Sequence, residues 1–452
     1  MWILSSRSAS DFPTGWRDAV YAAVKSAFNV SSAENLLALA EVSDFAKTDM
    51  GHPGEGPWTY RILREPSLTA ELQRRSHPQS SRRVDSVTFQ PCSPHVYQNQ
   101  DRYVVEEWNL PGGTWQFNSI FDGHVNHHTV DYVAQTLPGN LRGSLSEALR
   151  KSGSRPISYD HVSQVLRDSV VQLDDAICSN FLDLFPRDLR RLSRITHKEV
   201  QNIFRSDHSG WSRSAAAKCL GGTTLILSLT DPHEQNLWIA NLGDCHAVFG
   251  VRHHNRGWAS TLINHIHSGQ NPREVRRITG EHPREPESIK NGRVLGFLEP
   301  TRAIGDVWLK IPSLYTSRVF SNLDQGWISQ GTLKQCVTKI STPPYVSNIP
   351  DVYHRNLSAQ PWFLILCSDG LPSAETYEGM DPPAMAKTWT ECVGQILDSR
   401  SPAIVNTALS LLRAAIGGQD ERKVSQNLTV EMEERWMDDV SISIQRSLSE
   451  RG

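Results

Sequence analysis

Three aspartates in this chain stand at the edge of a β-like run, beside residues that suit a binding site. Asp122 and Asp369 follow apolar runs and each precedes a glycine, whereas Asp438 comes just before the apolar run that begins at Val440. An Asp at a strand end projects its carboxylate from a rigid sheet into a loop-lined cleft, and a following glycine lets the backbone approach a ligand closely. The pattern marks these three residues as candidates for chemistry.

Carboxylates that converge in one cleft repel one another unless cations neutralise them. Hard oxygen ligands of this kind suit Mg²⁺ or Mn²⁺. The competing interpretation is that each Asp-Gly pair only closes a turn, because both residues are common in turns. Hydrophobic periodicity alone does not decide between a metal site and a set of turns.

The elements that must position these aspartates are mostly strands joined by turns. Two strands are predicted at 103–108 and 115–121 around a Pro-Gly-Gly turn, and others at 223–229, 237–242, 246–251, 362–367 and 440–444. Apolar residues at helical spacing predict helices over 128–137, 161–185, 272–278 and 402–416. Strands recur in pairs and helices cluster in blocks, so an α+β layered domain fits better than a doubly wound parallel sheet.

Composition narrows the classes of function. The 452 residues carry 49 Asp and Glu against 46 Lys and Arg, so the chain lacks the basic footprint of a nucleic-acid-binding protein. No apolar run approaches the roughly 20 residues that cross a bilayer, and the run at Trp2 is too short for a secretory signal. The 7 cysteines are scattered, without a Cys-x-x-Cys pair, and indicate reduced thiols. We therefore expect an intracellular protein, cytoplasmic or mitochondrial, without a membrane span.

Several short segments give a stronger functional signal, because they occur in a fixed order. They are Phe121–His124, Gly221–Thr224, Ala240–Cys245, Thr301–Asp306, Ser368–Gly370 and Asp438–Ile442. In this order they resemble the metal-dependent type 2C protein phosphatases, the PPM family, and the resemblance runs from about Val87 to Gln445. Residues 270–283 and 293–296 look most like the pyruvate dehydrogenase phosphatase branch and its fungal relatives.

The resemblance implies both a fold and a reaction. The fold would be a four-layer αββα sandwich, two antiparallel sheets flanked by helices, with a two-metal centre at one end. The activity would be that of a protein serine/threonine phosphatase, in which a hydroxide bridging two Mg²⁺ or Mn²⁺ ions attacks the phosphorus of a phosphoprotein substrate. His124 is the matching candidate for the general acid that protonates the leaving alkoxide.

The resemblance also assigns metal ligands at matching positions. Asp122 would bridge both cations and take part in catalysis through them, and the carbonyl of Gly123 would bind one. Asp369 and Asp438 would complete the other site, and Asp244 would serve a weaker third cation. Gln100 stands where the family usually has a glutamate that helps to bind the second of the two main cations. Because the Gln100 oxygen is neutral, that cation would bind more weakly.

Further departures leave an alternative function open. Val125 and Asn126 replace the Gly-Gly that usually follows Asp-Gly-His. No residue matches the arginine that binds substrate phosphate in the family, and Arg102 is the nearest substitute. Together with Gln100, these departures suggest a catalytically impaired phosphatase-like protein that binds phosphoproteins or regulates a partner.

Two local interpretations concern neighbouring residues of the same motifs. A zinc cluster of His124, His127 and His128 is an alternative use of these histidines, opposed by the lack of a Glu between them. Arg302 and Asp306 lie four residues apart, so we expect a structural ion pair near the cleft.

The expected organisation of the chain is one main domain with extensions. Residues 1–85 are predicted to be an N-terminal extension and linker, with helices over 16–28 and 34–45. Residues 86–446 are predicted to be the phosphatase-type domain and residues 447–452 a tail. The stretch 311–358 is rich in Pro, Ser and Asn and predicts a surface insertion. Because Asp122 and Asp438 must meet in one centre, most of the chain is expected to fold as a single domain.

Overall fold

The computed structural model describes residues 44–90, 98–153, 155–253, 257–323, 326–399, 405–432 and 435–447. The helix predicted over 16–28, nearly all of the N-terminal helix predicted over 34–45, and the tail after residue 447 lie outside the described residues. Phe45, where the second of these helices was expected to end, begins a strand, β1 (Phe45–Thr48).

One sheet holds the hairpin that carries the first aspartate motif. Its strands, in pairing order, are β14 (Asp351–Asn356), β8 (Asn236–Leu242), β7 (Gly222–Thr230), β6 (Gly113–His124) and β5 (Asp101–Leu110), and the short β13 (Ile304–Gly305) also pairs with β7. All neighbouring strands are antiparallel. Gly112 and Gly113 close the predicted hairpin at φ values of 94° and 131°, which glycine adopts readily.

The other sheet holds the strands next to the two later aspartate motifs. Its strands, in pairing order, are β10 (Gly257–Leu262), β9 (His246–His253), β15 (Trp362–Cys367), β16 (Val440–Arg446), β4 (Val84–Phe89) and β3 (Gln79–Ser80). These strands are antiparallel too. Every residue of β15 is buried, which explains its continuous apolar sequence, since both faces of the strand are covered.

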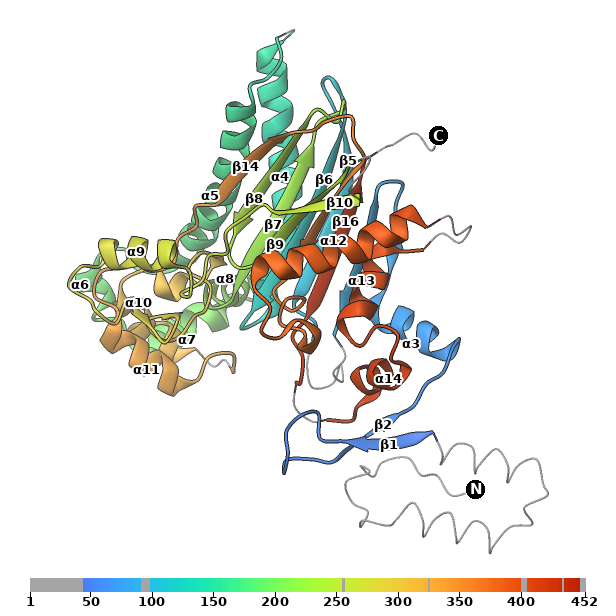
Figure 1. The fold of residues 1–452 in the computed structure, drawn as a ribbon. Coiled ribbons are helices and arrows are strands. Elements are labelled where there is room, and N and C mark those ends of the chain that lie inside the picture. Colours follow the sequence, from blue (N-terminus) through green and yellow to red (C-terminus); the bar gives the residue numbers. More distant parts are fainter. Residues whose placement is uncertain are drawn as a thin grey trace, which may run out of the picture.

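The sheets pack face to face, and helices cover both outer faces (Figure 1). Ile120 and Ile226 of the first sheet meet Phe249 and Leu364 of the second in a common core. The outer face of the first sheet carries α4 (His127–Ser152), α5 (Tyr159–Leu182) and α8 (Trp211–Leu220). The outer face of the second carries α3 (Ser67–Ser76), α12 (Pro382–Asp398) and α13 (Thr407–Ala415). The predicted αββα sandwich is confirmed.

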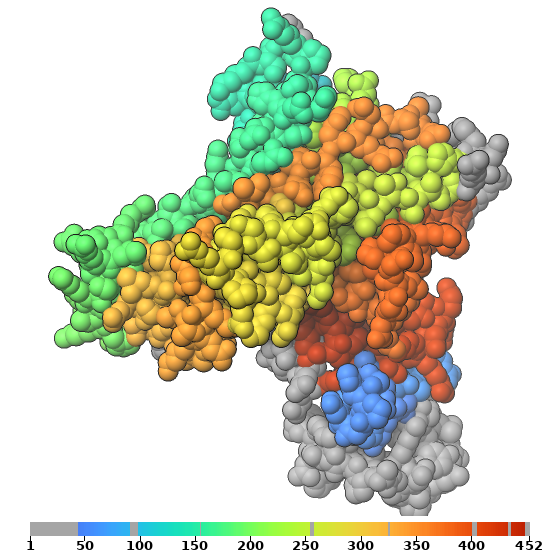
Figure 2. Space-filling model, turned by 60° about the vertical axis from the view of Figure 1, so that its left-hand side comes forward, coloured from blue at the N-terminus to red at the C-terminus, as the bar shows by residue number. Residues whose placement is uncertain are grey.

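The remaining elements surround this sandwich. They are β2 (Trp58–Arg61), β11 (Ile289–Lys290), β12 (Arg293–Val294), α6 (Leu189–Leu192), α7 (His197–Ser206), α9 (Pro272–Glu281), α10 (Ser313–Arg318), α11 (Gln330–Lys339), α14 (Glu421–Thr429) and the 3-10 turns η2 (Val307–Leu309), η3 (Phe320–Asn322) and η4 (Glu375–Tyr377). In Figure 2, the light orange segment with α10 and α11 lies beside the yellow segment with α9. Among the described residues, no helix is both long and apolar enough to cross a bilayer.

The predicted domain limits stay a prediction, but two strands bear on them. β14 lies inside the proposed insertion 311–358, yet it is the edge strand of the first sheet. The helices α10 and α11 precede it, so an insertion at this place would end before Asp351. At the N-terminal side, β3 carries the second sheet back to Gln79, ahead of the predicted limit at residue 86.

Candidate metal centre

Asp122 lies near the end of β6, an inner strand of the first sheet next to the edge strand β5. Its Cα partners are Asp101 on β5 and Thr224 on β7. The next residue, Gly123, has no space for a side chain, because a Cβ atom there would come within 2.7 Å of both the Gln100 carbonyl oxygen and Val130 Cγ1. The Asp-Gly pair is therefore part of a tightly packed strand end, and not a turn.

Asp244 and Asp369 lie close to Asp122 and come from the ends of other strands. Asp244 lies in the turn between β8 and β9, and Asp369 follows β15. One carboxylate oxygen from each of Asp122, Asp244 and Asp369 lies within 4.8 Å of the others. Sequence reasoning gave Asp244 a weaker, third site, whereas the structure places it in the most compact group of carboxylates.

Burial and mutual repulsion disfavour the charged form of these acids. Burial, followed by the charges of Asp369, Asp101 and Asp244, raises the pKa of Asp122 well above its usual value. Burial and the charges of Asp244 and Asp438 do the same to the pKa of Asp369. Burial also raises the pKa of Asp244 to about 6. A divalent cation would relieve this repulsion, and carboxylate oxygens are the donors that Mg²⁺ and Mn²⁺ prefer.

Asp101 and Asp439 are buried acids beside this group that sequence reasoning did not single out as functional. Burial and the charge of Asp439 raise the pKa of Asp101 to about 8. Its Oδ2 accepts a hydrogen bond from Ser368 Oγ at 2.6 Å, while its buried Oδ1 lacks a partner among the described residues. The signal was available, because Asp101 follows Gln100 in the first acidic motif and Asp439 follows Asp438.

Asp438 and Gln100, two predicted ligands, lie at the border of the carboxylate group. The Asp438 side chain is 49% exposed and forms an ion pair with Arg435. Its charge nevertheless contributes to the raised pKa of Asp369. Gln100 contacts the site through its backbone, since its N–H donates to Asp439 Oδ2 at 2.8 Å and its carbonyl accepts from Gly123 N–H at 3.2 Å.

His124, the predicted general acid, is held by Asp306. Its Nε2 lies 2.7 Å from Asp306 Oδ2, and the Asp306 side chain is fully buried. Gly222 makes this pair possible, because a Cβ atom there would come within 2.3 Å of His124 Nε2 and still closer to Asp306 Oδ2. Burial alone would lower the pKa of His124, but the charge and hydrogen bond of Asp306 outweigh burial and raise it.

Asp306 is fixed in turn by a buried ion pair behind it. Lys310 Nζ lies 2.8 Å from Asp174 Oδ2 and donates to the Ala303 carbonyl at 2.8 Å. Asp174 Oδ1 also accepts from Gly305 N–H at 2.7 Å. These bonds hold the segment from Ala303 to Asp306 at both ends, so the carboxylate that orients His124 stands on rigid backbone.

The expected ion pair between Arg302 and Asp306 is wrong. The i, i+4 spacing brings side chains together on a helix, but this segment contains the extended β13, and Asp306 takes a left-handed conformation at φ 47°. The two side chains therefore serve different sites. Asp306 binds His124, and Arg302 binds Glu274 and Asp351.

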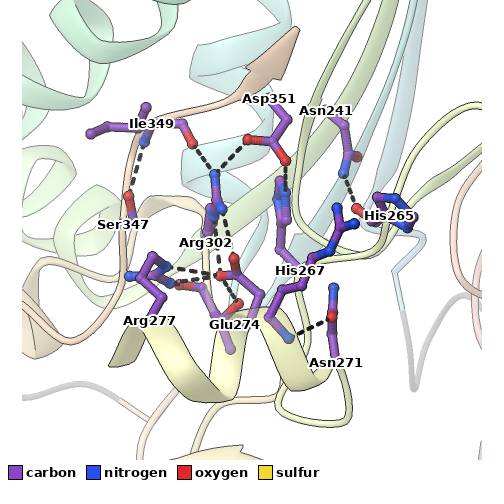
Figure 3. Close-up of polar contacts among 12 residues, drawn as sticks. Asn241, His265, His267, Asn271, Glu274, Arg277, Arg302, Ser347, Ile349 and Asp351 are labelled. Atoms are coloured by element: carbon purple, nitrogen blue, oxygen red, sulfur yellow. Dashed lines mark hydrogen bonds and ion pairs between the residues drawn. The ribbon is translucent and has the colours of Figure 1, made fainter. Parts of the chain in front are cut away.

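Arg302 belongs to a second group of charged residues, drawn in Figure 3. Its Nη2 lies 2.6 Å from Glu274 Oε1, and its Nη1 lies 3.0 Å from Asp351 Oδ1. Arg277 Nη2 lies 2.7 Å from Glu274 Oε2. His267 Nε2 lies 3.1 Å from Asp351 Oδ2. Each carboxylate in this group has a cationic partner from the chain itself.

The three histidines near Asp122 do not form the zinc cluster weighed as an alternative. His124 is the last residue of β6, whereas His127 and His128 begin α4, so the three do not share a helix face. The rings of His127 and His128 pack against each other with centroids 4.5 Å apart. In the part of the chain that the structure describes, the one group of at least three His, Cys, Asp or Glu arranged to hold a metal ion is that of Asp122, Asp244 and Asp369.

The replacements for the family's Gly-Gly have definite structural consequences. Val125 takes a φ of 70°, a left-handed conformation that is strained for a β-branched residue. Asn126 caps α4, since its Oδ1 accepts from His128 N–H at 2.9 Å, and its Nδ2 donates to the Ala217 carbonyl at 3.0 Å. The chain thus keeps the tight turn after His124 that glycines would adopt freely.

The carboxylates form a compact group at one end of the αββα sandwich, and a histidine bound to an Asp lies beside them. This arrangement is typical of a metal-dependent hydrolase. The sequence comparison agrees with this class, because residues 98–378, more than half of the chain, match the family model described as protein phosphatase 2C. The chain therefore belongs to the protein phosphatase 2C family, the metal-dependent protein serine/threonine phosphatases.

Curated relatives point to the branch expected from the sequence. A protein phosphatase 2C homolog of Schizosaccharomyces pombe is 26% identical over 363 residues, which cover 76% of each chain. The mitochondrial pyruvate dehydrogenase (acetyl-transferring) phosphatase 1 of Saccharomyces cerevisiae is 26% identical over 74% of this chain and 51% of its own length. The human protein of that name is 36% identical over 138 residues, 30% of this chain and 26% of its own. The match thus spans about half of the budding yeast protein and about a quarter of the human one.

Two solved structures are similar to this chain over most of its length. A serine-threonine phosphatase 2C from Toxoplasma gondii aligns over 82% of this chain and 97% of its own, with a TM-score of 0.47 and 16% identity. A C. elegans sex determining protein aligns over 81% of this chain and 65% of its own, with a TM-score of 0.46 and 18% identity.

The family match and the phosphatase relatives favour an enzyme over the alternative of a catalytically impaired, phosphoprotein-binding protein.

Proposed function

We infer that this chain dephosphorylates phosphoserine and phosphothreonine in proteins with the help of two divalent cations, Mg²⁺ or Mn²⁺, and a weaker third. The observation that carries this inference is the convergence of Asp122, Asp244 and Asp369 within 4.8 Å at the sheet ends, where each has a raised pKa. Such a group has a strong electrostatic reason to bind hard cations.

The residues present fit these cations. The donors are all oxygens, and the buried Asp101 Oδ1 without a partner adds a further acceptor beside the carboxylate group. Asp122, the Gly123 carbonyl and Gln100 would hold one cation, and Asp122, Asp369 and Asp438 would hold the other. Asp244 faces the same space and would also serve the third cation. When bound, the cations would activate a water for in-line attack and neutralise the phosphate charge.

The chain's own contribution to the reaction centres on His124. Because Asp306 occupies Nε2 and raises the pKa of the ring, His124 would hold a proton at Nδ1 for the leaving serine or threonine oxygen. The buried Asp306 fixes the tautomer and the orientation of the ring. Asp174 and Lys310 keep Asp306 in place through the backbone of Ala303 and Gly305.

The test is hydrolysis of an aryl phosphate and of a phosphothreonine peptide with Mn²⁺, with and without a chelator. Asp122→Ala should lower turnover by at least about 10³-fold, since it removes the ligand assigned to both cations. A matched control is Glu287→Gln, which removes an exposed partner of Lys290 and should leave turnover unchanged. Activity that is indifferent to both chelator and Asp122→Ala would contradict the inference.

The assignment of Gln100 has its own test. Gln100→Glu restores a negative charge at the border of the carboxylate group and should tighten the weaker Mn²⁺ site by about tenfold. Calorimetric titration measures this affinity directly. Unchanged affinity would show that Gln100 is not a ligand.

A further inference from the structure

A cavity lies next to the metal centre, and four arginines and three acids are among the residues that line it. Its volume is about 1320 Å³, more than the roughly 300–1,000 Å³ of a small-molecule site, and it is open to solvent. Arg61, Arg74, Arg75 and Arg102 line it, together with the acids Glu71, Asp101 and Glu431. A cavity of this size suits a segment of polypeptide.

Elements from both ends of the described chain build this cavity. Arg61 ends β2, and Arg74 and Arg75 lie in the last turn of α3. Thr429, the last residue of α14, closes another side. Figures 1 and 2 show the blue N-terminal elements against the red C-terminal ones. Hydrogen bonds from Arg61 N–H to Thr429 Oγ1 and from Thr429 Oγ1 to the Arg61 carbonyl, both 2.9 Å, join β2 to α14, so the wall is fixed.

Acids offset most of the arginines on the wall, because Glu71 and the exposed Glu431 also line it, but the Arg61 guanidinium remains able to bind an anion. Arg74 Nη2 lies 2.6 Å and Arg75 Nε 2.7 Å from Glu71 Oε1, and the Arg74 side chain is nevertheless 66% exposed. The two bonds of Arg61 to Thr429 use its backbone, and among the described residues nothing engages its guanidinium. Asp101 turns its Oδ2 to Ser368, on the side of the metal centre. Arg102 is held by Asp131 at 2.8 Å.

The cavity is one strand away from the proposed reaction site. Asp101, on its wall, is the Cα partner of Asp122, and such partners lie about 4.5–5.5 Å apart in antiparallel strands. Gln98 and Asn99, also on the wall, lead directly to Gln100 and Asp101. A chain whose phosphorylated residue sits at the carboxylate group would pass its neighbouring residues along this wall.

We propose that this cavity binds an acidic segment of the phosphoprotein substrate, next to the residue that is dephosphorylated. The proposal rests on the proposed function, because it names the substrates that the same centre would prefer. Arg61 and Arg74, the most exposed guanidinium groups on the wall, select Glu- and Asp-containing sequences, and bind them more weakly as salt screens the charges.

The test uses two fluorescent phosphothreonine peptides that differ only in flanking residues, Glu in one and Gln in the other. Fluorescence anisotropy with the full chain in chelator measures binding without turnover, and initial rates with Mn²⁺ give KM and kcat. The wild type should bind the Glu peptide about five- to tenfold more tightly, through two surface charge contacts. The double variant Arg61→Gln/Arg74→Gln should lose this discrimination in Kd and KM, with little change in kcat.

Arg150→Gln is the matched control, because Arg150 is also exposed but lies near the far end of α4. It should keep the full preference for the Glu peptide. Equal binding of both peptides by the wild type, or a preference that survives in the double variant, would overturn the proposal. If neither peptide releases phosphate with Mn²⁺ while anisotropy still discriminates between them, the proposed activity is wrong and the acidic subsite stands.

Discussion

Two groups of buried acids in this molecule have opposite electrostatics. At the sheet ends, Asp122, Asp244 and Asp369 approach one another, and none of them forms an ion pair with Arg or Lys among the described residues. On α9, Glu274, whose side chain is only 3% exposed, lies between the guanidinium groups of Arg277 and Arg302. Burial is common to both groups, and the presence of arginine separates them.

The pKa directions express this difference. Burial and neighbouring carboxylates raise the pKa of Asp122 and Asp369 well above the usual value. Burial also acts to raise the pKa of Glu274, but hydrogen bonds from Arg302 and Arg277 outweigh it and lower the pKa. Removing a buried acid that arginines neutralise would leave those arginines unpaired and destabilise the fold, whereas carboxylates that repel one another are poised for an external cation.

Removing the charge of Glu274, which two arginines neutralise, should have the largest effect on stability. Glu274→Gln leaves Arg302, whose side chain is 12% exposed, without its closest partner and should lower the free energy of unfolding by about 3–5 kcal/mol. Urea unfolding in chelator measures this change. The control Glu287→Gln breaks an exposed pair and should cost less than about 1 kcal/mol.

Removing a charge from the metal centre should not lower the free energy of unfolding. In chelator at pH 8, Asp122→Asn removes a repelled carboxylate and should leave the protein as stable as the wild type or more stable. A loss as large as that of Glu274→Gln would break the distinction between the two groups.

Metal should act on one group only. Mn²⁺ at about 100 times its dissociation constant should add about 2.7 kcal/mol to the unfolding free energy of the wild type. Thermal unfolding with and without chelator reveals this gain. Asp122→Ala should lose it, whereas Glu274→Gln, although less stable, should keep it. Equal metal stabilisation of both variants would contradict the assignment of the metal centre to Asp122.

Low pH should reduce the stability that Asp351 contributes, and this effect should be smaller than those above. A hydrogen bond from His267, with Arg302 adding to it, lowers the pKa of Asp351 to about 2. Because this pKa is depressed, the Asp351 contribution is complete above its ordinary pKa of about 4 and is lost as pH falls toward 2. The melting temperature of Asp351→Asn should therefore fall less steeply than that of the wild type between pH 4 and pH 2. Parallel curves would mean that His267 and Arg302 do not lower the pKa of Asp351.

The sequence predicted the positions of the carboxylates better than their partners. Asp122 and Asp369 were identified because strand ends and following glycines are local features, visible as an apolar run and a dipeptide. Partners depend on which strands become neighbours and on the direction of each side chain. Arg302 and Asp306 show this, since one left-handed residue in an extended segment sends them to different sites.

The position of Asp101 opposite Asp122 could not be predicted, for a related reason. Its neighbour Gln100 stands at the family's ligand position, but the strand register puts Asp101 opposite Asp122 and buries its carboxylate. Register follows from the β5–β6 hairpin as a whole and cannot be read from the residues around position 101 alone. The order of the motifs predicted the family, whereas the position of Asp101 and Asp439 beside the carboxylate group is visible only in the folded chain.

The turn that holds Asp244 links β8 of the first sheet to β9 of the second. Asp122 belongs to the first sheet and Asp369 follows a strand of the second, so the three carboxylates come together only when the two sheets have packed. Contacts between residues this far apart in the chain form late and slow the search for the native state. We therefore expect tight cation binding to appear late in folding. The rate at which the refolding chain gains affinity for Mn²⁺ would then report the rate at which the two sheets pack together.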